Sequence, residues 1–409
     1  MRTIDEATAE ALNGSRAGDE LEVFAWYNGR LAVPTKLDVS DWSLRWDGSA
    51  SKLVQGVLDL NIADRDGSLA PWLFDDPLGV GGAVLQCRYL VGGAGMVNMG
   101  WYRITSNAPK ESWYSRVIPE AGHQNEPEAR IPYGHRLVMV SGGSTVPVTA
   151  QDLTVNLTLD RFLAPEQPPA GAKVHSEIRR IVGDYMPVTI GDDVPDTAVP
   201  SGTTYDDERM GAVIDLADSV GARFRMGGNG ELQIYMPSTD PVWTVTGGDG
   251  GALINVDRSQ DIDQLRNIGV ARGEQKWTDE AGQEQTRPLQ SVATIDIGPI
   301  RSGGPAGRIP VFLDSPLLHT QEAVDKAART LIDNRVTGLT TDLEVTCLPH
   351  PALQVGDWVT VTQPIIDGTS VPLTGEVTDI SLRRGTAMTL RVRCSTEAVQ
   401  HVIRSARGL

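Results

Sequence analysis

Two short patterns in the chain contain residue types that could bind a metal ion. Cys347 and His350 have C-x-x-H spacing, as in a zinc-binding pair, but no second Cys/His pair lies nearby in the sequence. Zinc takes about four ligands, or three and a water. Asp64, Asp66 and Gly67 resemble the start of a calcium loop, but the bidentate Glu is missing at the required offset. We therefore interpret these patterns as a strand cysteine with a turn histidine, and as a polar turn, and we expect no metal and no cofactor.

Histidines and paired carboxylates could provide acid–base chemistry. His135 and His175 could each act as a general base, but neither has a nucleophile near it in the sequence. A carboxylate pair such as Asp192 and Asp196 would suit sugar hydrolysis, yet 53 acidic residues produce such pairs by chance. The G-x-S-x-G, H-E-x-x-H and phosphate-loop motifs are absent from the sequence. We predict no catalytic residue and expect that the protein is not an enzyme.

The segment HPALQVGDWVTV, near the end of the chain, contains a pronounced turn-and-strand signal. Pro351 and Leu353 lead into the dipeptide Gly356-Asp357, and Val359 lies in the strand that follows. Glycine permits a turn conformation that other residues resist, and aspartate can bond to the backbone of such a turn. The pattern indicates a tight turn followed by a strand, and nothing in it resembles a catalytic site.

Length and charge limit the class of protein. A chain of 409 residues is long enough for two to four domains. The net charge of −17 argues against tight binding to phosphate backbones, although it is compatible with a pore through which DNA passes, and solubility alone explains it as well. We expect neither a signal peptide nor a membrane segment. Cys87, Cys347 and Cys394 lie in alternating apolar runs, which predicts buried thiols and synthesis in a reducing cytoplasm.

The order of elements predicts a mainly β protein with an α+β insert. We expect four parts. They are an N-terminal arm or helix (1–17), a tube-type antiparallel β-barrel domain (18–165) with a loop insertion at 108–144, a small α+β domain (173–245), and a C-terminal β-barrel domain with one helix (250–409). Asn28-Gly29 between apolar runs predicts a hairpin. Thr320 is a suitable cap for a helix over 318–336.

Four aromatic residues are candidates for a protein interface: Trp72, Trp101, Trp113 and Tyr114. Exposed aromatic side chains anchor interfaces. The alternative is that they fill the cores of the β domains.

The C-terminal series of motifs resembles the last domain of phage tail-hub (baseplate hub, tail-associated) proteins. QEAVDKAARTLIDNRV is followed by LEVTCLPHPALQVGDWVTVTQP and then by GEVTDISLRRGTAMTLRVRC. Pro351, Leu353, Gly356, Asp357 and Val359 match the P-x-L-x-x-G-D-x-V turn of that family. The segment MGAVIDLADSVGARFRMGGNGELQIYMP resembles its middle unit, and GSLAPWLFDDPLGVGGAVLQCRYLVGG resembles the N-terminal domain of hubs from long-tailed actinobacteriophages.

The resemblance covers about three quarters of the chain and implies an assembly. Hub proteins are typically homotrimers in which each subunit contributes two tube-like barrels to a pseudo-sixfold ring, and the Gly-Asp turn closes one barrel. Implied partners are the chain itself, a distal tail or tail tube protein, a tape-measure protein, and a tail fibre or spike, with DNA passing through the channel without specific binding. The implied location is the distal tail tip of the virion, after synthesis in the host cytoplasm.

Two other functions stay open. A tail-tip protein could bind a host receptor or glycan through Trp113 and Tyr114. A cell-wall hydrolase is the other alternative. We do not expect it, because the hub-like domain closes close to Leu409 and the insertion at 108–144 is short for such an enzyme.

Overall fold

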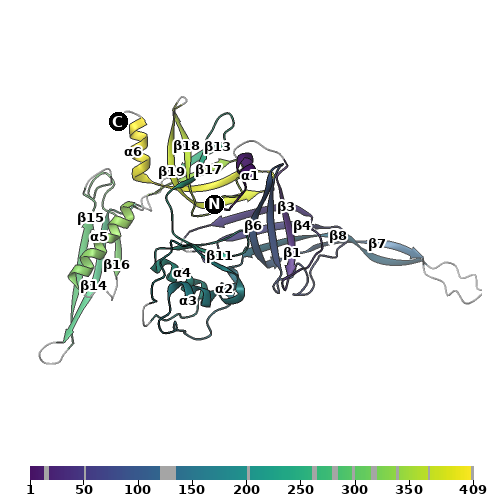
Figure 1. Ribbon diagram of the computed structural model, residues 1–409, viewed down its shortest axis with the longest axis horizontal. Coiled ribbons are helices and arrows are strands. Elements are labelled where there is room, and N and C mark those ends of the chain that lie inside the picture. Colours follow the sequence, from purple (N-terminus) through teal and green to yellow (C-terminus); the bar gives the residue numbers. More distant parts are fainter. Residues whose placement is uncertain are drawn as a thin grey trace, which may run out of the picture. The chain divides into compact units, whose positions relative to one another are not determined.

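The computed structural model divides into two compact units (Figure 1). The first contains Met1–Asn255, Val345–Val359 and Glu376–Arg391, and the second contains Val256–Glu344, Thr360–Gly375 and Val392–Leu409. The structure describes residues 1–12, 18–49, 52–119, 135–199, 203–259, 265–278, 284–296, 300–314, 320–337, 340–366 and 369–406. This division differs from the predicted one, in which 250–409 form a separate domain. The reason is long-range pairing, because the C-terminal strand β19 pairs with the N-terminal strand β3.

The first unit is built on a large antiparallel sheet. Its neighbouring strands follow the order β19-β3-β4-β8-β6-β5-β1-β2, and β7 pairs with β8. Helix α1 (Glu6–Leu12) precedes the sheet. The strands are β1 (Glu20–Tyr27), β2 (Arg30–Leu31), β3 (Val39–Asp47), β4 (Gly56–Asp64), β5 (Val84–Val91), β6 (Gly95–Asn107), β7 (Lys110–Pro119), β8 (His135–Asp152) and β19 (Thr369–Arg383). The mainly β, antiparallel fold predicted from the sequence is confirmed.

Alternation and turn chemistry explain the strands that were predicted well. Asn28 and Gly29 both have positive φ, which matches the right-handed twist of the hairpin β1–β2. Along β3, Trp42, Leu44 and Trp46 are buried on one face, as the period of two requires.

The prediction of a loop insertion at 108–144 is wrong for the described part. Strands β7 and β8 pair from Lys110↔Thr145 to Pro119↔His135 and form a two-stranded ribbon. Among the described side chains of residues 110–117 and 137–142, none is buried, so the apolar alternation that marks a half-buried strand is weak, and Pro119 adds a breaker signal in the sequence. The part of the insertion at 120–134 lies outside the described residues.

A small α+β region follows β8. Its helices are α2 (Val155–Leu159), α3 (Val174–Val182) and α4 (Arg209–Ser219), with the 3-10 turn η1 (Gly183–Tyr185). Its strands β9 (Val188–Ile190), β10 (Arg223–Met226) and β11 (Leu232–Tyr235) form a second sheet. Ile178, Ile181, Met210, Val213 and Ile234 belong to its core. The β character expected up to residue 163 is wrong at α2, where the alternating apolar residues form a short helix that buries Val155 and Leu157 and exposes Leu159.

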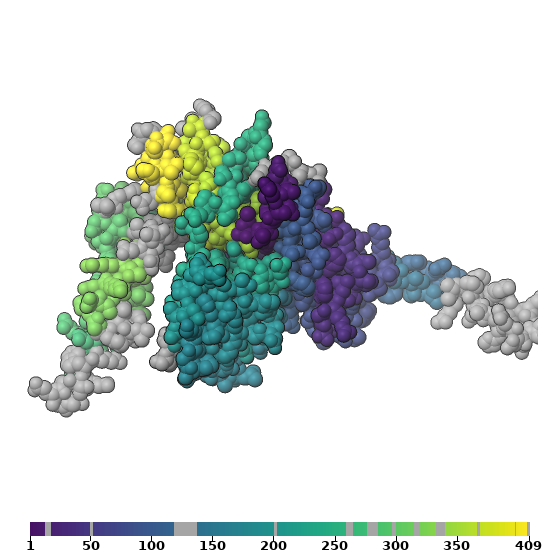
Figure 2. All heavy atoms as spheres, in the orientation of Figure 1, coloured from purple at the N-terminus to yellow at the C-terminus, as the bar shows by residue number. Residues whose placement is uncertain are grey.

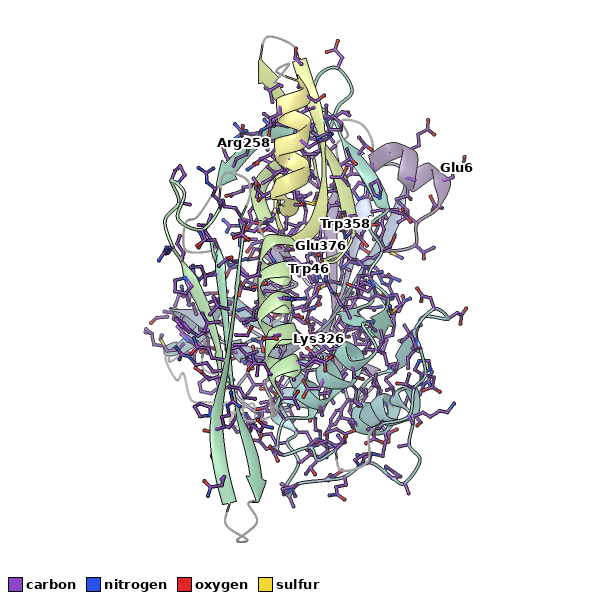
Figure 3. All side chains as sticks on the ribbon, turned by 90° about the vertical axis from the view of Figure 1, so that its left-hand side faces the viewer. Glu6, Trp46, Arg258, Lys326, Trp358 and Glu376 are labelled. Atoms are coloured by element: carbon purple, nitrogen blue, oxygen red, sulfur yellow. The ribbon has the colours of Figure 1, made fainter. Side chains whose placement is uncertain are left out.

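The second unit contains a three-stranded sheet and a long helix. Strand β14 (Ile268–Thr278) lies between β15 (Glu284–Thr294) and β16 (Pro310–Asp314). Helix α5 (Gln321–Thr337) packs on this sheet through Val324 and Ala328 (Figure 3, where Lys326 marks the helix). The predicted cap is confirmed, since the Thr320 hydroxyl accepts a hydrogen bond from the Ala323 amide at 3.2 Å.

The remaining elements precede or follow the three-stranded sheet and α5 in the sequence, and most of the strands among them are divided between the two units. They are β12 (Pro241–Val245), β13 (Leu253–Ser259), β17 (Thr340–Cys347), β18 (Trp358–Ile366), β20 (Met388–Ser395) and α6 (Thr396–Ala406). Strands β13, β17, β20 and β19 are neighbours in that order. None of the helices in the described part of the chain is long and apolar enough to cross a membrane.

Candidate assembly surfaces

The turn at 350–357 is held against strand β19. The Gly356 amide donates to the Val377 carbonyl at 2.8 Å, and the Val377 amide donates to the Asp357 carbonyl at 2.8 Å. Gly356 has φ +84°, a conformation that glycine adopts without strain. Leu353 and Val359 are buried, and Pro351 is buried with them. The role of this turn in closing a barrel stays a prediction.

The carboxylate of Asp357 is the polar centre of this turn. Its Oδ2 accepts a hydrogen bond from the Gln354 amide at 2.9 Å. Its Oδ1 accepts from Arg225 Nη1 at 2.9 Å and from the Met1 nitrogen at 2.5 Å. The side chain is almost fully buried, and a buried charge is tolerated only where such partners satisfy it. Asp357 therefore connects three segments of the first unit that are distant in the sequence: the N-terminus, strand β10 and the turn at 350–357.

Sequence reasoning missed Arg2, which supports the same turn. Its Nη1 donates to the carbonyls of Pro351 at 2.9 Å and Leu353 at 2.7 Å. The guanidinium carbon lies 5.0 Å from the centre of the Trp46 ring, and burial lowers the pKa of Arg2 to about 10. The sequence offered only one sign of this contact, a charged residue close to the N-terminus. No residue near Arg2 in the chain indicated that its partners are the carbonyls of Pro351 and Leu353. The predicted N-terminal arm is thus docked at residues 1–2.

The residues considered for chemistry have structural roles where they are described. The His350 ring packs against Trp243 with ring centres 4.5 Å apart and the ring planes tilted by 41°, and Cys347 is buried in β17. His175 contacts the Val194 carbonyl through Nε2 at 3.1 Å. No group of three or more potential metal ligands occurs in the part of the chain that the structure describes. The His135 side chain lies outside the described residues.

The polar turn predicted after β4 is confirmed. Asp64 Oδ1 accepts from the Gly67 amide at 3.1 Å, and Oδ2 accepts from the Leu69 amide at 3.0 Å and from the Ser144 hydroxyl at 2.6 Å. Asp64 thereby connects this turn to the base of the ribbon.

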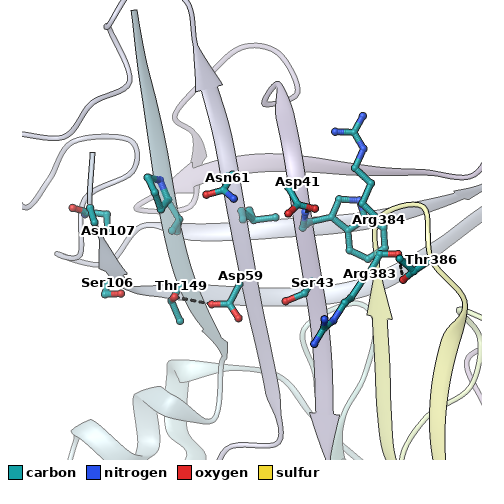
Figure 4. A pocket seen from close by; sticks show the side chains of 15 residues that line it. Asp41, Ser43, Asp59, Asn61, Ser106, Asn107, Thr149, Arg383, Arg384 and Thr386 are labelled. Atoms are coloured by element: carbon teal, nitrogen blue, oxygen red, sulfur yellow. Dashed lines mark hydrogen bonds between the residues drawn. The ribbon is translucent and has the colours of Figure 1, made fainter. Parts of the chain in front are cut away.

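A polar groove crosses strands β3, β4 and β8 (Figure 4). It has a volume of about 520 Å³. Asp59 accepts a hydrogen bond from the Thr149 hydroxyl at 2.7 Å, and Arg384 Nη1 donates to the Val39 carbonyl at 3.1 Å. The described lining includes serines and aspartates but neither histidine nor cysteine.

The loop after β4 exposes three consecutive large apolar side chains: Trp72, which is 79% exposed, Leu73 and Phe74. Asp76 holds their backbone in place, because its Oδ2 accepts from the amides of Trp72 at 2.6 Å and Leu73 at 2.7 Å. These bonds, first that of Leu73, lower the pKa of Asp76. The Phe74 carbonyl accepts from the Gly81 amide at 2.8 Å. The three exposed apolar side chains therefore lie on a turn whose backbone is held by hydrogen bonds.

The ribbon exposes a second apolar surface. Trp113, Val117, Leu137 and Met139 are each more than half exposed. Figure 2 shows the ribbon, in blue, standing clear of the purple strands of the same unit. Sequence reasoning identified Trp113 but missed the other three, because their cross-strand pairing was not predicted.

The four predicted interface aromatics do not come together. Trp72, Trp113 and Tyr114 are exposed. Trp101 packs against Trp26 with ring centres 5.3 Å apart, so this indole contributes to packing within the chain. An interface role for the four residues stays a prediction.

Comparisons with known proteins give likenesses in structure only. The chain is similar to the 43 kDa tail protein of prophage MuSo2 from Shewanella oneidensis, with TM-score 0.55, 13% identity and coverage of 92% of this chain and 98% of that one. It is similar to a tail protein from Neisseria meningitidis MC58, with TM-score 0.54, 15% identity and coverage of 91% and 96%. No protein-family model and no curated protein sequence matches. The chain thus has the fold of these tail proteins along nearly its whole length.

Proposed function

We propose that this protein is a structural component of a phage tail: the hub at the distal end of the tail tube. The observation that carries the proposal is the shared fold, which covers more than nine tenths of this chain and of two tail proteins. Fold alone does not fix function, so the exposed surfaces supply the second support. Three consecutive apolar side chains on an ordered loop and four more on a ribbon are features of a subunit that associates.

The proposed assembly is a homotrimeric ring around the DNA channel. Its partners would be a distal tail or tail tube protein, a tape-measure protein inside, and a fibre or spike outside. The net charge of −17 supports a channel wall that does not bind phosphates, because affinity for DNA arises mainly from lysine and arginine contacts.

Mass and symmetry test this proposal. A homotrimer of the 44.0 kDa chain has a mass of about 132 kDa. Mass photometry of the purified protein, followed by electron microscopy of the particles, should give that mass and a threefold ring with an open channel. A protein that stays monomeric and is absent from purified tails would contradict the proposal that it is the tail hub.

A receptor-binding role is the second candidate, and the exposure of Trp113 and Tyr114 favours it. The double substitution of both residues by alanine separates the two functions. Particles that assemble normally but no longer adsorb to host cells would support receptor binding. Particles that fail to assemble would assign the two aromatics to packing between subunits.

A further inference from the structure

The polar groove on the first unit contains a continuous row of hydrogen-bonding side chains. The row is formed by directly opposite residues on five neighbouring strands: Ser106 on β6, Thr149 on β8, Asp59 on β4, Ser43 on β3 and Arg383 on β19. All five line the groove, and Figure 4 shows their side chains following one another across the sheet. Residues directly opposite one another project to the same face. The floor of the groove is therefore a polar strip that runs at right angles to the strands.

A second, shorter row lies beside the first. Asp41 on β3 is directly opposite Asn61 on β4, and each is two residues along its strand from a member of the first row. The carboxylates of the groove accept hydrogen bonds, the guanidinium groups donate them, and the hydroxyl and amide groups do both. A ligand rich in hydroxyl groups, each of which is donor and acceptor, would find a partner at every strand.

The charges of the groove balance. Its lining contains two carboxylates, Asp41 and Asp59, and two guanidinium groups, Arg383 and Arg384, although the chain as a whole has a net charge of −17. An anionic ligand would lie beside the aspartates, and a cationic one beside the arginines. In the part of the chain that the structure describes, no group of three or more potential metal ligands occurs. The balance favours an uncharged polar ligand.

The floor of the groove is arranged before a ligand binds. Asp41 Oδ1 accepts a hydrogen bond from the Trp42 amide at 2.9 Å, and Asp59 Oδ1 accepts one from the Thr149 hydroxyl at 2.7 Å. A carboxylate can accept about four hydrogen bonds, so both keep acceptor capacity for a ligand. Short side chains on paired strands lose little conformational entropy on binding, which favours affinity.

The dimensions of the row suit a chain of sugar units. Strands in a sheet lie about 4.8 Å apart, so a row across five strands spans about 19 Å. This spacing is close to the length of one pyranose unit in an extended oligosaccharide. The volume of the groove, about 520 Å³, lies in the range of about 300–1,000 Å³ that is common for ligand sites. An extended peptide fits less well, because it adds to a free sheet edge, and each of these five strands has a neighbour on both sides.

We propose that this groove binds a neutral oligosaccharide, which lies across the strands with about one sugar unit per strand. The site goes beyond the proposed tail hub and does not depend on it, because every residue of its lining belongs to the first unit of a single chain. It is also separate from Trp113 and Tyr114, which do not line the groove.

Isothermal titration calorimetry of the full chain tests this site. The probes are four neutral pentasaccharides, cellopentaose, maltopentaose, mannopentaose and chitopentaose, with pentagalacturonic acid as the charged comparison. We expect at least one neutral probe to bind. Its affinity should rise from the disaccharide to the pentasaccharide and then level off, because the row ends after five strands.

Two variants of the row and one matched control locate the binding. Asp59→Ala removes an acceptor from the centre of the row and should raise the dissociation constant about tenfold or more. Ser43→Leu places an apolar side chain in the row and should abolish binding. Neither native side chain is buried, so Tm should stay unchanged in both variants. Asp75→Ala, at an exposed aspartate outside the groove, should bind as the native chain does.

Several outcomes would overturn the proposal. They are the absence of binding with all four neutral probes at millimolar concentration, equal affinity for the disaccharide and the pentasaccharide, binding that persists in both row variants, and a preference for pentagalacturonic acid. Failure of this site and failure of the hub are distinguishable. A trimer that binds none of the sugars contradicts only the groove, whereas a monomer that is absent from tails but binds a neutral pentasaccharide contradicts only the hub.

Discussion

Replacing Gly356 by alanine should destabilise the first unit more than its small size suggests. The residue has φ +84°, and a Cβ added to it would overlap the hydroxyl oxygen of Tyr235. Tyr235 cannot move freely, because the Arg225 guanidinium lies 4.5 Å from its ring centre. Arg225 in turn donates to the buried Asp357 at 2.9 Å. One added methyl group therefore disturbs the whole set of contacts around the turn.

The expected loss of stability follows from these contacts. The left-handed conformation costs an L residue about 1–2 kcal/mol. Displacing Tyr235 from Arg225 removes a cation–π contact worth about 1–2 kcal/mol at a partly desolvated site. We expect Gly356→Ala to lower the free energy of unfolding by about 2–4 kcal/mol. For a unit of this size that corresponds to a fall in Tm of about 4–12 °C.

Differential scanning calorimetry measures this effect, and the chain offers two controls. Gly385 has φ +65° with open space around its missing Cβ, so Gly385→Ala should show the backbone cost alone. Tyr235→Phe removes the overlapping oxygen, and the double variant G356A/Y235F should recover part of the loss. If G356A and G385A lower Tm equally, the overlap with Tyr235 is not the cause and the reasoning is wrong.

Three further predictions concern other contacts. Arg2→Met keeps apolar bulk but leaves the Pro351 and Leu353 carbonyls without their donor, so chemical denaturation should show a loss of about 2–4 kcal/mol. Thr320→Ala removes the cap of α5 and should cost about 1 kcal/mol, whereas Thr320→Ser should be nearly neutral. Burial raises the pKa of the Cys347 thiol to about 12, so its contribution to stability is complete below the unfolded pKa of about 8.5 and is lost as pH rises towards 12. Unfolding titrations should therefore show a smaller alkaline loss for Cys347→Ala, and a slope identical to the native one would refute the assignment.

Local signals explain what could be predicted from the sequence. The hairpin at Asn28-Gly29 and the capped helix α5 depend on residues that are neighbours in the chain, and both were predicted. The turn at Gly356-Asp357 was recognised for the same reason, because a positive φ and a backbone-bonding aspartate are local requirements.

The rest depends on partners that are distant in the sequence. Arg2 and Asp357 became part of one site only through contacts across more than 340 residues. Strand β7 was not predicted because its described side chains are not buried. Val117 and Leu137 can be recognised as neighbours on one face only once the pairing of β7 with β8 is known. The division of residues 250–409 between the two compact units could not be predicted either, because it depends on the pairing of β19 with the distant strand β3.

Rigidity and association should then be separable properties of this chain. The contacts of Gly356, Arg2 and Asp357 are buried within the first unit, whereas Phe74 and Leu137 contribute little to its packing because they are exposed. A change at the turn should lower Tm while the mass of the assembled protein, measured by mass photometry below the unfolding transition, stays the same. A charged residue in place of Leu137 should abolish association at an unchanged Tm of the isolated chain. If Leu137→Asp lowers Tm as much as Gly356→Ala, the ribbon is part of the core of its own unit, and the interpretation of its exposed apolar side chains as an association surface fails.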